Sequence, residues 1–178
     1  MKLTQRAVRG FTLIELVVVI SILAVLSGVV IPRVSSHQRS ARDARRLADI
    51  KTLRNAVEQF HMDRGEYPVP RANSFKGQWE VSTDENFLEV LREEGYLDRE
   101  FSDPINDESF HYRYFVYESG AYGCQDEGPF FVLGIRNFES NLFADANRGF
   151  FKCGTRDWAV EFAYVVGGGA DAVGSAAE

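Results

Sequence analysis

The sequence contains few of the residues from which metal and redox sites are built, and its charge balance is not that of a nucleic-acid binder. Among 178 residues there are two cysteines and three histidines. No Cys-x-x-Cys occurs, and no spacing typical of metal ligands links the histidines, which are His37, His61 and His111. This pattern argues against a zinc site. The formal net charge of -6 argues against general nucleic-acid binding, which needs a basic surface.

The motifs of the common catalytic sites are also missing. The sequence has no phosphate-binding loop, no nucleophile elbow and no His-Glu-x-x-His. The glycines at 167–169 are not followed by a helix signal, so they do not read as a dinucleotide-binding turn. We therefore expect a protein that is not an enzyme.

What the sequence does have is an uneven distribution of charge. Residues 1–10 carry +3, residues 33–64 carry +4 and residues 65–178 carry -12. Between the two basic stretches, residues 11–31 form a run of 21 residues, of which 16 are strongly apolar. A helix needs about 20 such residues to cross a bilayer, so the run predicts a membrane-spanning segment.

Two simple explanations of this run fit it incompletely. A cleaved signal peptide has an apolar core of about 7–15 residues and a small-residue cleavage site, whereas this run is longer and no Ala-x-Ala closes it. A plain membrane anchor leaves Glu15 unexplained, because a carboxylate in an apolar span costs roughly 3 kcal/mol. We expect nothing else inside the span to pair with Glu15, so it needs a partner from elsewhere.

The start of the run carries a specific motif. It reads Arg9-Gly10-Phe11-Thr12-Leu13-Ile14-Glu15, and Pro32 stands at the twenty-second position counted from Phe11. This pattern resembles the N-terminal signature of type IV pilins and pseudopilins. The resemblance implies that a prepilin peptidase cuts between Gly10 and Phe11 and then methylates the new amine of Phe11. Residues 1–10 would be a cleaved basic leader, and residues 11–32 the transmembrane and polymerisation half of a long helix.

The same resemblance implies a partner for Glu15. In this family the new amine, here on Phe11, meets the Glu of a neighbouring subunit during assembly. Two charges that are each unfavourable alone in hydrocarbon favour docking when they pair. Glu15 and Pro32 are therefore expected to act in assembly of a filament with copies of this chain and other pilin-like subunits.

The resemblance also implies where the chain is and what handles it. It would be a single-pass protein of the bacterial inner membrane with its head in the periplasm. An inner-membrane assembly platform would then move it into a periplasmic or extracellular filament.

Residues 33–64 are predicted to form the amphipathic half of the helix. Apolar residues recur there at helical spacing, namely Ala44, Leu47, Ile50, Leu53, Val57 and Phe60. This stripe is expected to pack on the head. The arginine-rich opposite face is either a solvated face or one that meets acidic heads or anionic lipid headgroups.

Residues 65–166 are predicted to form an extracytoplasmic α+β head. Ser82 to Glu85 resembles a capping box before a short helix that stops at Gly95. Three antiparallel strands are expected at residues 110–117, 130–135 and 159–166. The glycine-rich end, residues 167–178, is expected to be a flexible tail. The fold class is therefore α+β, a long N-terminal helix packed on a small antiparallel sheet, as in the type IV pilin-like fold.

A second and shorter resemblance covers residues 60–117. The order of a long helix, Gly-x-Tyr-Pro, Gly95-Tyr96-Leu97 and Asp103-Pro104 is similar to the G-type major pseudopilins of type II secretion. Here Ile105-Asn106 follows the Asp-Pro pair, where that family usually has Trp-Gly. The resemblance implies a structural subunit of a periplasmic pseudopilus for protein export.

A major or minor pilin of a surface pilus is the alternative. Such a subunit would act in adhesion, motility or DNA uptake. The acidic head gives no reason to expect nucleic acid as a ligand.

The head also contains both cysteines and several acids that bear on cofactors. In an oxidising compartment Cys124 and Cys153 are most simply a disulfide. G-type pseudopilins are known for a calcium site late in the head, for which Asp126 with Glu127, or Asp145 with Asp157, are the available acids. Calcium needs 6–8 converging oxygen atoms and no such spacing links these acids. We therefore read them as solvated surface acids and expect no cofactor.

Overall fold

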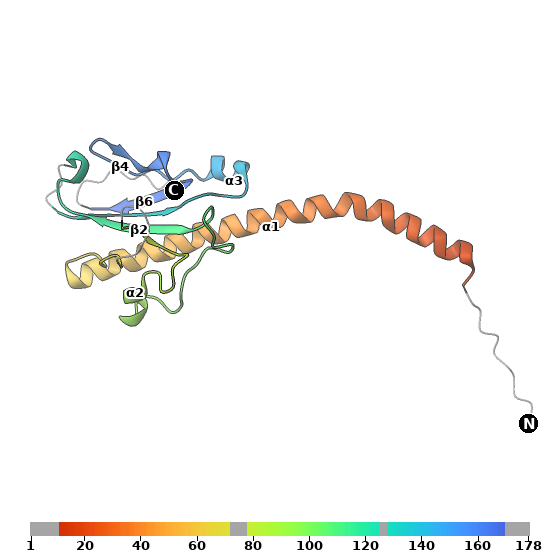
Figure 1. Cartoon of the computed structure of the whole chain (residues 1–178), viewed down its shortest axis with the longest axis horizontal. Helices are drawn as coiled ribbons and strands as arrows, with labels where there is room; N and C mark the ends of the chain where they lie inside the picture. The colour runs from red at the N-terminus through yellow and green to blue at the C-terminus, as the bar shows by residue number, and fades with distance from the viewer. Residues whose placement is uncertain (1–10, 72–77, 125–127, 170–178) are drawn as a thin grey trace, which may run out of the picture. The chain divides into compact units, whose positions relative to one another are not determined.

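The computed structural model describes residues 11–71, 78–124 and 128–169 of the chain. The chain divides into two units, residues 1–38 and residues 39–178. Helix α1 (Leu13–Arg64) begins in the first unit and ends in the second (Figure 1). Its helical backbone continues without a break through Pro32.

The second unit is built on a four-stranded antiparallel sheet with the strand order β1-β2-β3-β6. Its strands are β1 (Glu80–Val81), β2 (Tyr112–Tyr117), β3 (Phe130–Ile135) and β6 (Tyr164–Gly168). The register pairs Tyr114 of β2 with Leu133 of β3, and Leu133 with Val166 of β6. The predicted α+β fold, an N-terminal helix followed by a small antiparallel sheet, is confirmed.

Strand β3 is buried on both faces, because side chains along a strand alternate between its two sides. Phe131 and Leu133 join the core that contains the buried residues of α1. Phe130 and Val132 join a second core on the other face of the sheet. In Figure 1 α1 crosses one face of the sheet, and β4 lies on the side away from α1.

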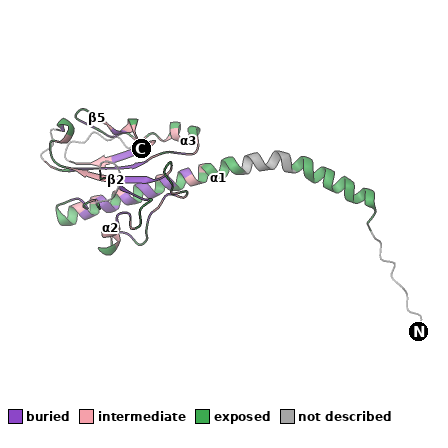
Figure 2. Cartoon of the chain, viewed as in Figure 1, coloured by how far each residue is buried: buried purple, intermediate pink, exposed green. Residues whose placement is uncertain are grey.

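The apolar stripe predicted on the second half of α1 forms the helical side of the first core. Ile50, Leu53 and Val57 have no exposed surface, whereas Ala44 is exposed. Figure 2 shows the change along the helix, from exposed residues in the described N-terminal part to alternating buried ones beside the sheet. This periodic burial is expected when one stripe of a helix packs on a sheet.

The second core is closed by a small lid of short elements. These are η1 (Ala121–Gly123), the hairpin of β4 (Lys152–Cys153) and β5 (Arg156–Asp157), and η2 (Trp158–Val160). Helix α3 (Asn141–Ala146) packs instead against the first core through Phe143 and Ala144. Trp158 is fully buried and its ring lies 5.3 Å from that of Phe151 and 5.7 Å from that of Phe130. Aromatic side chains therefore supply most of the surface buried under the lid.

The predicted start of the second helix was wrong. Helix α2 (Glu89–Glu93) begins later than the Ser82–Glu85 box indicated, and Leu88 precedes it. Ser82 is instead buried beside the sheet, where its hydroxyl accepts the Tyr112 N–H at 2.9 Å. The buried carboxylate of Glu80 accepts the Leu88 N–H at 2.7 Å. A tertiary contact from β1 therefore takes the place of the local cap.

The last strand also differs from its prediction. Residues 158–160 form η2, because the Asp157 side chain caps this turn by accepting the Ala159 N–H at 2.9 Å. The strand begins at Tyr164 and continues through Gly167 and Gly168, which pair with Val132 and Phe131. A Cβ on Gly167 would lie 2.3 Å from the Phe151 ring, so only glycine fits this close packing. The sheet therefore includes two residues expected in the tail, and residues 170–178 lie outside the described part.

Candidate functional site

Thr12 and Glu15 close the first turn of α1 by hydrogen bonding to each other. The backbone N–H and the hydroxyl of Thr12 donate to Glu15 Oε2 at 2.8 and 2.6 Å. The Glu15 N–H donates in return to Thr12 Oγ1 at 3.4 Å. Since α1 begins at Leu13, Thr12 is the N-cap and Glu15 the third helical residue, which is the geometry of a capping box.

The capping box corrects one expectation about Glu15. Nothing in the apolar run was expected to pair with this carboxylate, but Thr12 satisfies it with two hydrogen bonds. The spacing Thr-x-x-Glu directly before an apolar run is the signal that would have identified Thr12. Residues 11–26 contain no cation, so the charge of Glu15 is not neutralised within that segment.

Apolar side chains cover the described N-terminal part of α1 on every side. The large exposed ones are Phe11, Leu13, Ile14, Leu16, Val17, Val18, Val19, Ile20, Ile22, Leu23, Val25 and Leu26. Ser21 donates its hydroxyl to the Val17 carbonyl at 2.7 Å, so the polar side chains of residues 11–26 are all hydrogen-bonded inside the helix. Such a surface suits an apolar surrounding or close packing on other helices.

The structure bears only in part on the predicted membrane span and on the motif positions Gly10 and Pro32. Among the described residues, no helix combines the length and the hydropathy that crossing a membrane requires. Gly10 lies outside the described residues, and Phe11 is the first residue after it. The side chains of residues 27–34, including that of Pro32, also lie outside the described part.

A buried arginine joins the second half of α1 to two loops of the head. Arg46 has no exposed surface, and its Nε and Nη2 bind Asp103 in a bidentate pair at 2.6 and 2.9 Å. Its Nη1 donates to Asp43 at 2.6 Å and to Glu139 at 2.9 Å. The Arg46 guanidinium also lies 5.0 Å from the ring centroid of Phe110. A buried guanidinium is tolerated only when its donors are paired in this way.

The acids around Arg46 are themselves tied to neighbouring groups. Arg42 makes a bidentate pair with Glu139 at 2.7 and 2.6 Å. Asp43 accepts the backbone N–H groups of Glu139 and Ser140 at 3.0 and 2.9 Å. The network therefore holds the loop between β3 and α3 against α1.

Electrostatics in this network favours the charged forms. The hydrogen bonds from Arg42, and then those from Arg46, outweigh burial and lower the pKa of Glu139 to about 2. Burial by itself lowers the pKa of Arg46, but its hydrogen bonds to Asp103 and Glu139 hold the pKa above its usual value. Both groups are therefore ionised at neutral pH.

Two arginines of the predicted arginine-rich face of α1 are engaged by the chain's own head. Arg42 and Arg46 pair with acids of their own head, so neither is a free solvated cation. Arg45 is about half exposed and lies 3.5 Å from Asp49. The sequence did not identify Asp103 and Glu139 as partners, because they lie 57 and 93 residues from Arg46 along the chain.

Cys124 and Cys153 form a disulfide, with 29 residues separating them in sequence. Both cysteines are buried in the second core beside Trp158. The bond ties the segment after η1 to β4. The Thr155 N–H strengthens the same connection by donating to the Tyr122 carbonyl at 2.9 Å.

The acids considered for calcium are engaged elsewhere or lie outside the described residues. Asp145 pairs with Arg148 at 2.9 Å, and Asp157 caps η2. Asp126 and Glu127 belong to the undescribed segment 125–127. Within the described ranges no group of three or more His, Cys, Asp or Glu side chains is arranged to hold a metal ion.

Comparison with known proteins gives one family model at the N-terminal motif and several similar proteins over longer stretches. The model of the prokaryotic N-terminal methylation motif matches residues 5–31. The type II secretion system core protein G of Escherichia coli is 30% identical over 136 residues, which are 75% of this chain and 90% of that protein. Core protein G of Aeromonas hydrophila is 35% identical over 65 residues, covering 36% of this chain and 46% of the relative. Core protein G of Pseudomonas aeruginosa is 38% identical over 64 residues, covering 36% and 45%. No solved structure matches the chain.

Proposed function

The chain belongs to the family of the type II secretion system core protein G, and from this premise we propose that it is a pseudopilin, a structural subunit of a periplasmic pseudopilus for protein export. The observation that carries the proposal is the alignment over 90% of the Escherichia coli protein, together with the methylation motif at residues 5–31. The predicted G-type resemblance is thereby confirmed. The role is structural, since the chain would act by polymerising.

Processing is the first step that we assign to named residues. A prepilin peptidase is proposed to cut between Gly10 and Phe11 and to methylate the amine of Phe11. The motif match spans both residues, and Phe11 is exposed immediately before the capping box. The cut would leave Thr12 as the second residue, so the new amine would lie one residue from the cap of α1.

Membrane anchoring before assembly is proposed for residues 11–32. The run is apolar, and each of the three polar side chains between 11 and 26, Thr12, Glu15 and Ser21, makes a hydrogen bond within the segment. Every backbone amide in a helix interior is also paired, which is what the bilayer requires of a segment inside it. The head would then lie in the periplasm, where the Cys124–Cys153 disulfide is compatible with the oxidising environment.

Assembly is proposed to use Glu15 as the docking charge for the Phe11 amine of a neighbouring copy. Thr12 supports this role because its two hydrogen bonds hold Glu15 Oε2 at the first turn of α1. Pro32 is proposed to act in the same packing of helices. The partners are other copies, other pilin-like subunits and the inner-membrane assembly platform.

No metal is proposed to be required for the folded head. Asp145 and Asp157 already serve the Arg148 pair and the η2 cap. We expect a chelator to leave the midpoint of thermal unfolding unchanged, and added calcium to leave it unchanged as well. A rise of several degrees on adding calcium would contradict this and direct attention to Asp126 and Glu127.

One experiment tests the proposed function directly. The full chain is expressed in a cell that carries its own secretion system, and its intact mass is measured after purification from the membrane. Loss of residues 1–10, one added methyl group and co-purification with the secretion platform are expected. Recovery of the protein only in sheared surface fibres would contradict the secretion role and favour a pilus subunit.

A further inference from the structure

The four most exposed large apolar side chains of the described head lie in two groups. Met62 and Val69, 76% and 77% exposed, lie at and just beyond the C-terminal turn of α1. Leu142 and Val160, 84% and 87% exposed, lie on α3 and η2. Every other large apolar residue that is exposed between residues 39 and 169, in the described ranges, is less than half exposed. Figure 1 shows the C-terminal end of α1 and helix α3 at opposite ends of the head.

The two elements that carry Leu142 and Val160 also contribute to a groove of about 250 Å³. Its lining residues are Ala144, Asp145, Arg148, Gly149, Ala159, Phe162 and Ala163. Leu142 and Asp145 are three residues apart on α3 and so share one face of that helix, and Val160 follows Ala159 directly. Four of the seven lining residues are alanine or glycine, and Leu142 and Val160 belong to the same two elements as Ala144 and Ala159.

The group at the end of α1 projects into solvent. Met62 and Val69 protrude, and the intervening turn brings Tyr67 back to stack on His61 at 4.0 Å. Asp63 and Glu66 are exposed beside them, and Arg64 is already paired with Glu94. This end therefore offers two aliphatic side chains with carboxylates next to them.

The groove carries one exposed Arg–Asp pair, and the α1 end carries exposed carboxylates. Arg148 lines the groove and is 80% exposed, and its pairing is with Asp145 at the short helical spacing of three residues. Such an exposed pair contributes little to stability, so Arg148 is available to a second carboxylate. Glu66 of another head would supply one, since Asp63 already accepts the Tyr96 hydroxyl at 3.0 Å.

From this match we propose that the α3–η2 groove of one copy receives the Met62–Val69 end of a second copy. The proposal rests on the proposed function, because copies of a filament subunit meet at high local concentration. A contact between two different surfaces of the same chain continues as an open helical array when its rotation does not close a ring. Burial of the four aliphatic side chains would drive the contact, and Arg148 with Glu66 would set its direction.

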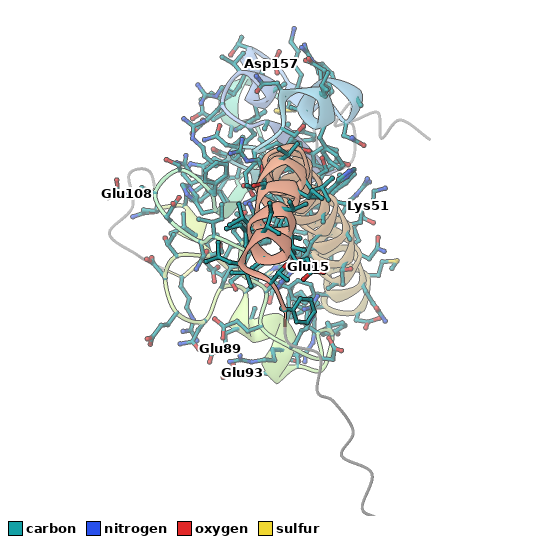
Figure 3. The ribbon with its side chains drawn as sticks, turned by 90° about the vertical axis from the view of Figure 1, so that its right-hand side faces the viewer. Glu15, Lys51, Glu89, Glu93, Glu108 and Asp157 are labelled. Carbon is teal, nitrogen blue, oxygen red and sulfur yellow. A yellow bond between two sulfur atoms is a disulfide. The ribbon has the colours of Figure 1, made fainter. Side chains whose placement is uncertain are left out.

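Cross-linking of the full chain in its own membrane tests this contact. The variant Val69→Cys with Val160→Cys should give, under mild oxidation, a ladder of oligomers that a reductant collapses, because each copy links to two neighbours. Either single variant should give no species beyond a dimer. The matched control is Val69→Cys with Lys51→Cys, which should give no ladder. Lys51 is exposed on the side of the head, well apart from α2 and from Asp157 (Figure 3).

A second variant separates failure of the contact from failure of the proposed function. Val160→Asp should lower the yield of sedimented filament at least tenfold, whereas Ile105→Asp, at a less exposed apolar site, should leave it unchanged. Filaments that form normally from Val160→Asp, or that contain the cysteine pair without a ladder, would overturn the inference and leave the pseudopilin function intact. Absence of filaments from the wild-type chain would overturn the proposed function and the inference with it.

Discussion

Arg46 shows how a single side chain can organise the join between a helix and a head. It is fully buried, yet it contacts three carboxylates from three segments of the chain, namely Asp43, Asp103 and Glu139. Asp103 in turn accepts the Ile105 N–H at 2.8 Å, so it shapes its own loop as well as the ion pair. Removing Arg46 would therefore leave several buried charges uncompensated at once.

The variant Arg46→Ala should lower the free energy of unfolding by about 3 to 5 kcal/mol, because one partner of a buried ion network is removed. Urea unfolding of the full chain in detergent, followed by tryptophan fluorescence, measures the change. Arg54→Ala is the matched control, since Arg54 makes a partly exposed pair with Glu58 on the same helix. It should cost about 0.5 kcal/mol or less. Similar losses in both variants would contradict the special role of Arg46.

His111 is a second residue whose surroundings determine its charge. It is buried, its Nδ1 lies 2.9 Å from the Asp107 carbonyl, and Arg113 Nε donates to its Nε2 at 2.8 Å. Burial, and then the positive charges of Arg113 and Arg136, lower the pKa of His111 below its usual 6.5, although the Asp107 carbonyl acts in the opposite direction. The folded protein therefore holds His111 neutral where the unfolded chain would protonate it.

Stability should consequently fall as the pH drops below about 6.5, because the unfolded chain takes up a proton at His111 that the folded chain does not. A second loss should follow between pH 4.5 and about 2, where Glu139 is ionised only in the folded state. Thermal midpoints measured against pH should show the first decline in the wild type and a smaller one in His111→Gln. Parallel curves for the two proteins would refute the assignment to His111, since Glu139 is the same in both.

At the scale of elements, the head is a sheet between two unlike covers. The helix α1 covers one face with aliphatic residues such as Ile50 and Leu53, whose spacing along the chain is regular. Short elements cover the other face with aromatic residues such as Trp158 and Phe151, held by the disulfide and by the turn of the β4–β5 hairpin. Gly154 in that turn has φ 54°, and a Cβ there would lie 2.2 Å from the Tyr122 carbonyl oxygen. The hairpin therefore docks on η1 only with glycine at this position.

Replacing both cysteines, Cys124→Ala with Cys153→Ala, should lower the free energy of unfolding by roughly 3 to 4 kcal/mol, as expected for a closed loop of this length. Urea unfolding with and without a reductant measures the effect. The reductant should destabilise the wild type by a comparable amount and leave the double variant unchanged. An unaltered unfolding midpoint in the double variant would show that the aromatic cluster holds the hairpin without the bond.

At the scale of the whole molecule, the described N-terminal part of α1 and the head have surfaces of different character. The described N-terminal part of α1 is apolar on every side and carries one carboxylate, whose position Thr12 sets. The head is acidic, and the positive charge of Arg46 is buried inside it. A subunit of this kind is suited to packing helix against helix and head against head.

Glu15→Leu should insert into the membrane normally but assemble poorly, because the apolar side chain removes both the cost of a buried charge and the partner of the Phe11 amine. The yield of sedimented filament should fall at least tenfold relative to the amount of membrane-bound subunit. Ser21→Leu is the matched control, since Ser21 only bonds back to the Val17 carbonyl, and its yield should stay near that of the wild type. Normal filaments from Glu15→Leu would contradict the pairing role.

Local patterns alone were enough to predict several parts of this protein. The methylation motif, the long helix, its stripe of Ile50, Leu53 and Val57, and strand β3 all depend on short spacings that a single sequence displays. The capping box of Thr12 and Glu15 was equally visible and was missed. At Ser82 the same kind of pattern misled, because a buried hydroxyl was taken up by the Tyr112 backbone.

Which groups distant in sequence come into contact depends on the tertiary structure. Arg46 meets Asp103 and Glu139, which lie 57 and 93 residues away along the chain. Glu80 meets the Leu88 amide, a contact that no local helix-capping pattern indicates. Gly167 enters the sheet for the same kind of reason, because packing against Phe151 leaves no room for a side chain. The sequence by itself determined the identity of the elements and the processing motif, since both depend on neighbours along the chain. The partners of the buried charges depend on neighbours in space, which only the folded chain brings together.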